Sequence, residues 1–209
     1  MKKLLLISGI LILLTTFIPA QNDPYIFGSL GGFSTGSAKN NPYKNSPAVV
    51  FSTGFGIPLY GAVSLYSRLS YIYKSNYTGR EYQSYINSDL EIMNELVETN
   101  ASFSQLLVNG GLQYNIHLSK EVNLGISGGI TYAMVNHMAA LPSGLVIQRL
   151  DNTGVFGVFS GVSIEKFFED TGASVFGEAQ YNYAKRNVVY FRDKFSGMNF
   201  TIGGKFYLN

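Results

Sequence analysis

The stretch from Gly197 to Asn209, GMNFTIGGKFYLN, decides the fold class. Its apolar and polar residues alternate, with Met198, Phe200, Ile202, Phe206 and Leu208 set against Asn199, Thr201, Lys205 and Tyr207. A period of two predicts a β-strand with one apolar and one largely polar face. A terminal strand is ordered only when a sheet holds it. The stretch therefore predicts a closed sheet in which this last strand pairs with the first.

Seven further segments with period-two character precede it. They are Pro24–Phe33, Ala48–Ile57, Ala62–Lys74, Ala101–Ile116, Val122–Val135, Val155–Lys166 and Ala173–Ala184. In Val122–Val135 the alternation is clearest, because large apolar residues occupy one face and mainly glycine and small polar residues the other. Together with the terminal stretch, these segments predict an all-β fold, an eight-stranded antiparallel up-and-down transmembrane β-barrel.

The connections between these segments alternate in length. Short connections follow the second, fourth and sixth segments, whereas the others are longer. Short turns at one end and long loops at the other are typical of outer-membrane barrels. We therefore expect the three short turns to lie on the same side as both chain ends. One alternative stays open, because Thr78-Gly79 could turn an additional hairpin and give ten strands.

A soluble antiparallel barrel, with its apolar faces around a ligand, is the other alternative. Three features favour the membrane. Glycine and small polar residues dominate the second face, and the apolar face lacks the lysine and glutamate that a soluble surface needs. Tyrosine and phenylalanine also gather near strand ends, as in the aromatic girdles of membrane barrels.

The N-terminal segment is of a different kind. Residues 1–20 contain Lys2 and Lys3, then an apolar run, then small residues ending at Ala20. This order predicts a secretory signal peptide followed by one barrel domain over residues 21–209. An uncleaved membrane anchor is the alternative, although the apolar run is short for a span of about 20 residues.

Composition excludes several classes of function. Without Lys2 and Lys3 the chain carries 13 basic and 13 acidic residues, so it lacks the basic excess that a nucleic-acid partner requires. Cysteine is absent, so no disulfide stabilises the exported protein. No phosphate-binding, dinucleotide or zinc pattern is present, and the expected cofactor and metal content is none.

Four stretches together resemble a known family. They are MKKLLLI with IPAQ at the N-terminus, FGSLGGF, GFGIPLYG and GGKFYL. The layout is similar to small OmpX/OmpA-like outer-membrane barrels, and in particular to the Bacteroidetes "outer membrane protein beta-barrel" or PorT-like family. The resemblance implies a bacterial outer-membrane location and recognition by the barrel-assembly machinery. It implies no enzymatic activity, and the chain departs from the usual aromatic terminus by ending on Leu208-Asn209.

Charged residues on the polar faces predict an interior network. The strand phases that turn apolar residues to lipid send Arg68 and Glu178 into the lumen at similar heights. A charge in a narrow lumen is costly unless it is paired. We therefore expect Arg68 and Glu178 to belong to one ion-pair network, with Lys205 and Glu165 forming a second layer nearer the turn side.

The longer connections hold the candidate partner-binding residues. Ser88 and Glu91 form a capping box, which predicts a short helix within Ser88–Glu98. The candidates are Glu91 and Glu95 on that acidic segment, Leu141 and Leu145 on an apolar loop, and Arg186 and Arg192 on a basic loop. Outer-membrane lipid, lipopolysaccharide phosphates and a surface or envelope protein are the expected partners.

One catalytic-looking pair is present. His117 and Ser119, with Glu121 nearby, have the residue types of outer-membrane lipid A deacylases. They fall at a short turn, on the opposite side from the outer leaflet where such chemistry belongs. We therefore expect no catalytic residues, and a structural, surface-interaction or assembly role. A narrow channel or secretion-system component, and a lipid A-modifying enzyme, remain as alternatives.

Overall fold

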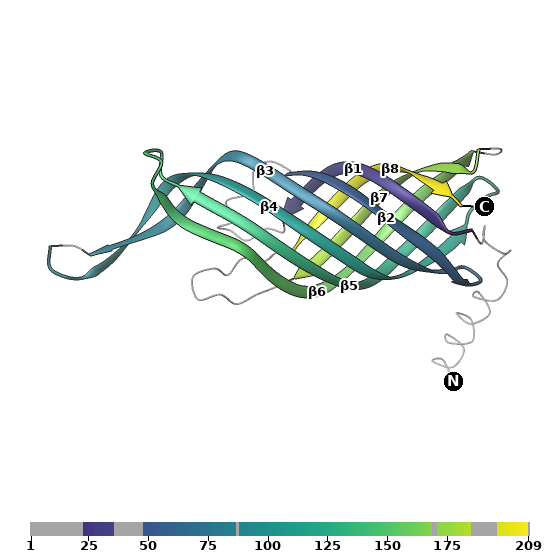
Figure 1. Cartoon of the computed structure of the whole chain (residues 1–209), viewed down its shortest axis with the longest axis horizontal. Helices are drawn as coiled ribbons and strands as arrows, with labels where there is room; N and C mark the ends of the chain where they lie inside the picture. The colour runs from purple at the N-terminus through teal and green to yellow at the C-terminus, as the bar shows by residue number, and fades with distance from the viewer. Residues whose placement is uncertain (1–22, 36–47, 87, 169–170, 185–195, 209) are drawn as a thin grey trace, which may run out of the picture.

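The computed structural model describes residues 23–35, 48–86, 88–168, 171–184 and 196–208, which form one closed barrel of eight antiparallel strands (Figure 1). The strands are β1 (Tyr25–Thr35), β2 (Ala48–Tyr60), β3 (Val63–Ile86), β4 (Ile92–His117), β5 (Val122–Ala140), β6 (Val146–Phe168), β7 (Ala173–Ala184) and β8 (Gly197–Tyr207). The predicted fold class is confirmed. Among the described residues no helix is long and apolar enough to cross a membrane. The expected signal segment 1–20 lies outside the described residues.

The barrel closes between its first and last strands. The register runs without a break from Tyr25 opposite Tyr207 to Thr35 opposite Gly197. Beyond this ladder, the Leu208 amide donates to the Pro24 carbonyl at 2.7 Å. The alternating terminal stretch thus pairs with the first strand, as predicted, and leaves no free edge in the barrel wall.

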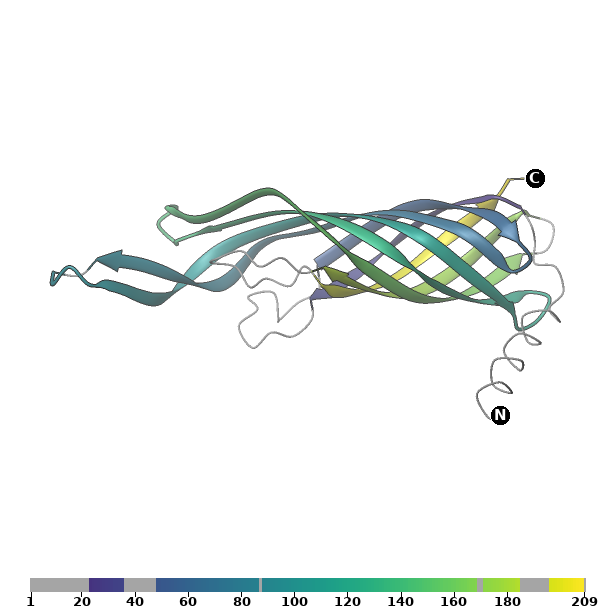
Figure 2. The same cartoon turned by 90° about the horizontal axis from the view of Figure 1, so that it is seen from below.

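The two ends of the barrel differ strongly. The turns after β2, β4 and β6 lie at the end that also holds Pro24 and Leu208, which confirms the expected sidedness. At the opposite end the β3–β4 and β5–β6 hairpins continue past the barrel wall (Figures 1 and 2). We call these two ends the turn end and the hairpin end.

The hairpins arise because four strands are longer than predicted. Thr78 and Gly79 do not turn but pair with Asn100 and Thr99, so β3 runs on past a bulge between Lys74 and Tyr77. The ten-strand alternative is therefore wrong. Three tyrosines, Tyr77, Tyr82 and Tyr85, lie on this extension of β3, and aromatic residues favour strands.

The helix predicted within Ser88–Glu98 is also wrong. The structure has a turn at residues 88–90, where Leu90 adopts a positive φ of 61°, and β4 then begins at Ile92. An isolated helix of this length is marginal in water. Pairing along the β3 extension, as in Tyr85 opposite Met93 and Glu81 opposite Val97, satisfies the same backbone groups and overrides the capping box.

Apolar side chains cover the outside of the barrel. On β3, Leu65, Leu69 and Tyr71 are 40–46% exposed, whereas Arg68 is completely buried. Other strands follow the same alternation, with outward residues such as Phe51, Ile130, Val162, Ile202 and Phe206. This arrangement is the reverse of a soluble barrel, which would turn its apolar faces inward, so that alternative is not supported.

Adjacent glycines in β4 offer a test of wall packing. A Cβ added at Gly111 would lie 2.1 Å from the Gly128 carbonyl oxygen, whereas one added at Gly110 meets no atom within 4 Å. We expect Gly111→Ala to lower the free energy of unfolding by about 1–3 kcal/mol, because it overpacks the contact between β4 and β5. Gly110→Ala should change it by less than about 0.5 kcal/mol. Urea unfolding in vesicles measures both, and equal effects would contradict this packing.

Candidate functional site: the filled lumen and the projecting hairpins

The barrel lumen is filled with side chains. An eight-stranded barrel has an interior just wide enough for them. From the turn end to the hairpin end the inward residues form a charged layer, an aromatic layer, a second charged layer, a layer of amides and an apolar cluster.

The central charged layer joins β3 to β7 across the lumen. Arg68 Nη1 lies 2.8 Å from Glu178 Oε1, and the two side chains are 0% and 6% exposed. The contact is an ion pair, and the angles at these two atoms do not meet those of a hydrogen bond. The same guanidinium donates hydrogen bonds to the hydroxyls of Ser52 at 2.8 Å, Ser70 at 3.0 Å and Thr201 at 3.2 Å. Arg68 is thus held by groups from four strands.

A second ion pair lies at the turn end. Lys205 Nζ on β8 lies 2.6 Å from Glu165 Oε2 on β6, and Tyr207 donates to Glu165 Oε1 at 2.6 Å. Ser174 on β7 also donates to Glu165. The Lys205 ammonium sits 4.6 Å from the centre of the Tyr25 ring on β1. The structure therefore brings together both residue pairs that the sequence predicts, in two layers.

Aromatic rings fill the space between the two charged layers. Phe27 stacks on Tyr66 with ring centres 5.9 Å apart and meets Phe176 edge-on at 5.7 Å. Tyr25 donates to Gln113 Oε1 at 2.7 Å, and Tyr66 points its hydroxyl at Glu178 at 3.4 Å. The rings and the ion pairs therefore form one continuous packing.

Apolar side chains close the lumen at the hairpin end. We call this cluster the apolar seal; its members are Phe33, Ala48, Val50, Ile72, Phe103, Leu107, Ala133, Val135, Val155 and Ala184. Sequence reasoning missed it, because it expected small polar residues on the whole inner face. The signal was present as consecutive apolar residues near that end, as in Leu106-Leu107-Val108.

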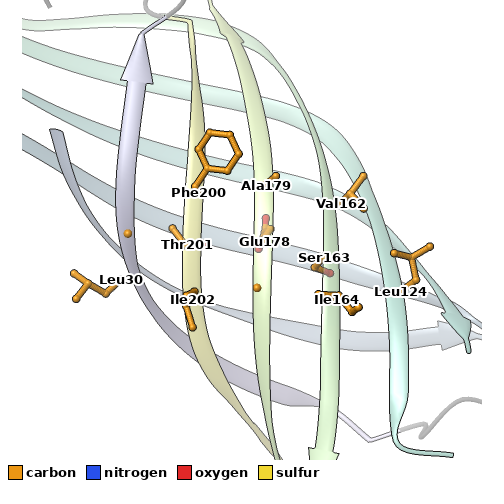
Figure 3. A pocket seen from close by; sticks show the side chains of 12 residues that line it. Leu30, Leu124, Val162, Ser163, Ile164, Glu178, Ala179, Phe200, Thr201 and Ile202 are labelled. Carbon is orange, nitrogen blue, oxygen red and sulfur yellow. The ribbon is translucent and has the colours of Figure 1, made fainter. Parts of the chain in front are cut away.

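The outer wall carries a shallow apolar depression of about 520 Å³. Figure 3 shows its lining on neighbouring strands: Leu30, Leu124, Val162, Ile164, Ala179, Phe200 and Ile202 surround it. Glu178 also belongs to the lining, but its carboxylate is paired with Arg68 in the lumen. The depression therefore offers mainly apolar contact.

The candidate partner-binding residues divide into three groups. Glu91 and Glu95 are exposed on the β3–β4 hairpin, next to the exposed Leu90 and Ile92. At the tip of the β5–β6 hairpin Leu145 is 61% exposed, whereas Leu141 is partly buried. Arg186 and Arg192 lie outside the described residues.

The pair His117 and Ser119 lies at the turn between β4 and β5. Ser119 Oγ accepts the backbone amides of Glu121 at 3.3 Å and Val122 at 3.1 Å, so the hydroxyl stabilises the turn. Within the described ranges no three His, Cys, Asp or Glu side chains are grouped as metal ligands.

The comparisons with known proteins support the fold. No family profile and no curated protein sequence matches the chain. The solved structure of Neisserial surface protein A matches with a TM-score of 0.56 and 9% identity, over 88% of this chain and 97% of that one. Ail, the attachment invasion locus protein of Yersinia pestis, matches with a TM-score of 0.47 and 10% identity, over 88% and 95%.

At such low identity the match to Neisserial surface protein A shows the fold alone, and the weaker likeness to Ail adds nothing to it. Membership of the PorT-like family stays a prediction. The chain has the architecture of an eight-stranded antiparallel β-barrel, a fold that it shares with Neisserial surface protein A.

Proposed function

We propose that this chain is a non-enzymatic protein of the bacterial outer membrane that presents its two projecting hairpins to a surface or envelope protein. The observation that carries the proposal is the contrast between the two ends. Side chains close the lumen in successive layers, whereas the β3–β4 and β5–β6 hairpins continue beyond the wall.

The distribution of side chains supports the membrane location. Large apolar residues point outward on all eight strands, among them Leu30, Phe51, Leu69, Val108, Ile130, Val158, Tyr181 and Phe200. The interior charges are paired with each other. An apolar outer band around a polar or plugged interior is what a bilayer requires of a barrel. Lipid and lipopolysaccharide are then the surrounding partners, and the barrel-assembly machinery is the partner during insertion.

Among the described residues, the hairpins offer strand edges that pair with no other strand. In the described part of the chain β3 pairs with β2 only up to Tyr73, although β3 continues to Ile86. Likewise β6 begins at Val146 but pairs with β7 only from Gly157. An unpaired edge presents a row of backbone donors and acceptors to another strand. The partner that fits is therefore a protein with an extended segment that adds to one of these edges.

The hairpin tips add a chemical preference. Leu90 is 85% exposed and Ile92 72%, and they flank Glu91 in the sequence. Leu145 and Val146 expose a second apolar patch at the neighbouring tip. These exposed apolar residues favour a partner segment with apolar side chains.

The filled lumen argues against the channel alternative. Phe33, Ile72 and Leu107 are at most 2% exposed in the apolar seal, and two further layers of paired charges lie below it. We expect no conductance from the purified barrel in planar bilayers, and step-like openings would favour a narrow channel. The lipid A alternative has no support from the pair His117 and Ser119, whose hydroxyl is engaged in a turn.

Photo-cross-linking in intact cells tests the proposed function. A cross-linking amino acid at Glu91 or Leu145 should capture a discrete protein, because both positions are exposed at the hairpin tips. The same amino acid at Leu118, equally exposed but on a turn, is the matched control and should not capture that protein. Capture of the same protein from both ends, or of none from the tips, would contradict the proposal.

A further inference from the structure

A layer of amide and hydroxyl side chains crosses the lumen between the Arg68–Glu178 pair and the apolar seal. Its members, which we call the amide layer, are Asn109 on β4, Thr131 on β5, Gln180 and Asn182 on β7, and Asn199 on β8. The register places Asn109 beside both Arg68 and Thr131, and Gln180 beside Asn199. All five side chains are at most 1% exposed.

One amide of the layer reaches across the lumen and joins β4 to β7. Asn109 Nδ2 donates to Gln180 Oε1 at 2.9 Å and to Asn182 Oδ1 at 3.1 Å. These bonds leave other polar atoms of the layer unused. Five of them have no hydrogen-bond partner among the described residues: Asn109 Oδ1, Thr131 Oγ1, Gln180 Nε2, Asn199 Oδ1 and Asn199 Nδ2.

Five such atoms in one layer require a partner. A buried polar group without a hydrogen bond costs about 1–3 kcal/mol, and proteins nearly always satisfy such groups with protein or ordered water. We propose that the amide layer is a binding site for ordered water. About two molecules satisfy the five atoms, because a buried water makes about three hydrogen bonds.

The mixture of donors and acceptors selects water over an ion. Gln180 Nε2 and Asn199 Nδ2 donate, Asn109 Oδ1 and Asn199 Oδ1 accept, and the Thr131 hydroxyl does both. An anion satisfies the donors but faces two carbonyl oxygens. A cation satisfies the acceptors but meets two amide groups, above a buried guanidinium. A water molecule donates and accepts at once, so it matches the whole set.

The apolar seal isolates this water from the hairpin end. Leu107 and Ala133 lie one inward position beyond Asn109 and Thr131 on the same strands, and both are completely buried. Phe33 is the register neighbour of Asn199 across the barrel seam. A water held beneath these groups stays long enough to be detected by magnetisation transfer to neighbouring amide protons.

Nuclear magnetic resonance of the full barrel in micelles tests the site. With ¹⁵N-labelled side-chain amides, Gln180 and Asn199 should show cross-peaks to water. Asn199→Leu should abolish the cross-peak at Gln180, because it removes two of the polar atoms that hold the water. Met198→Leu, at the adjacent outward position, is the control and should leave both cross-peaks unchanged.

Three results would overturn the proposal. The first is the absence of water cross-peaks at both amides in the unmodified barrel, which requires no variant to fold. The second is a Gln180 cross-peak that survives in folded Asn199→Leu. The third is a saturable shift of the Gln180 and Asn199 resonances when sodium chloride is titrated, since that would identify an ion site.

Discussion

Glu178→Ala should lower the free energy of unfolding of the barrel by about 3–5 kcal/mol, the usual cost of removing one partner of a buried ion pair. The substitution leaves the Arg68 guanidinium in the lumen with three hydroxyl partners and no counter-charge. Urea unfolding in lipid vesicles, followed by circular dichroism, measures the loss.

The double variant separates charge pairing from cavity formation. Arg68→Ala with Glu178→Ala removes both charges, so it should lose less stability than Glu178→Ala alone. The matched control is the pair of Lys166 and Glu121, whose charges lie 3.9 Å apart with side chains 58% and 50% exposed. Glu121→Ala should cost less than about 1 kcal/mol. A Glu178→Ala barrel as stable as the control would contradict the account of the lumen.

Glu165→Ala should have a comparable effect at the turn end. Glu165 accepts hydrogen bonds from Lys205, Tyr207 and Ser174, and its loss leaves the 4% exposed Lys205 next to the Tyr25 and Phe176 rings without this counter-charge. We expect about 3–5 kcal/mol of lost stability, again because one charge stays buried without its partner. Because Lys205 and Tyr207 lie on the strand that closes the barrel, unfolding should also become faster.

Two companion variants identify the cause of that loss. Glu165→Gln keeps hydrogen-bond acceptors for Tyr207 and Ser174 but removes the charge, so a loss close to that of Glu165→Ala assigns the effect to Lys205. Adding Lys205→Met to Glu165→Ala should recover part of the stability, since methionine fills the same space without a charge. If Lys205→Met deepens the loss instead, the ion pair is not the source of the stability.

Much of the barrel follows from local pattern. The alternation in Val122–Val135 and in the terminal stretch identifies strands and their outward faces, because side chains of a strand point to opposite sides of the sheet. The same strand phase places the Arg68 and Glu178 side chains in the lumen. Because the lumen is narrow, the two side chains contact each other there. The interior ion pairs are therefore accessible to sequence reasoning through strand phase and height.

The strands at the hairpin end were harder to predict from the sequence, for a physical reason. Ser88 and Glu91 satisfy a local helix signal, whereas the strand that forms instead is stabilised by pairing with Tyr82 and its neighbours on the preceding strand of the same hairpin. The sequence pattern did not predict the apolar seal either, for a related reason. Ile72 and Val50 lie between apolar neighbours, so alternation in polarity disappears where both faces of the wall are apolar.

Cysteine labelling in intact cells tests the central claim most directly, because the chain has no cysteine of its own. Glu91→Cys at the hairpin tip should react with a membrane-impermeant maleimide on intact cells. Leu118→Cys on the turn, which is 57% exposed, should react only after the outer membrane is permeabilised. Labelling of both positions only after permeabilisation, or of Leu118→Cys alone on intact cells, would contradict an outer-membrane barrel that presents its hairpins to the outside.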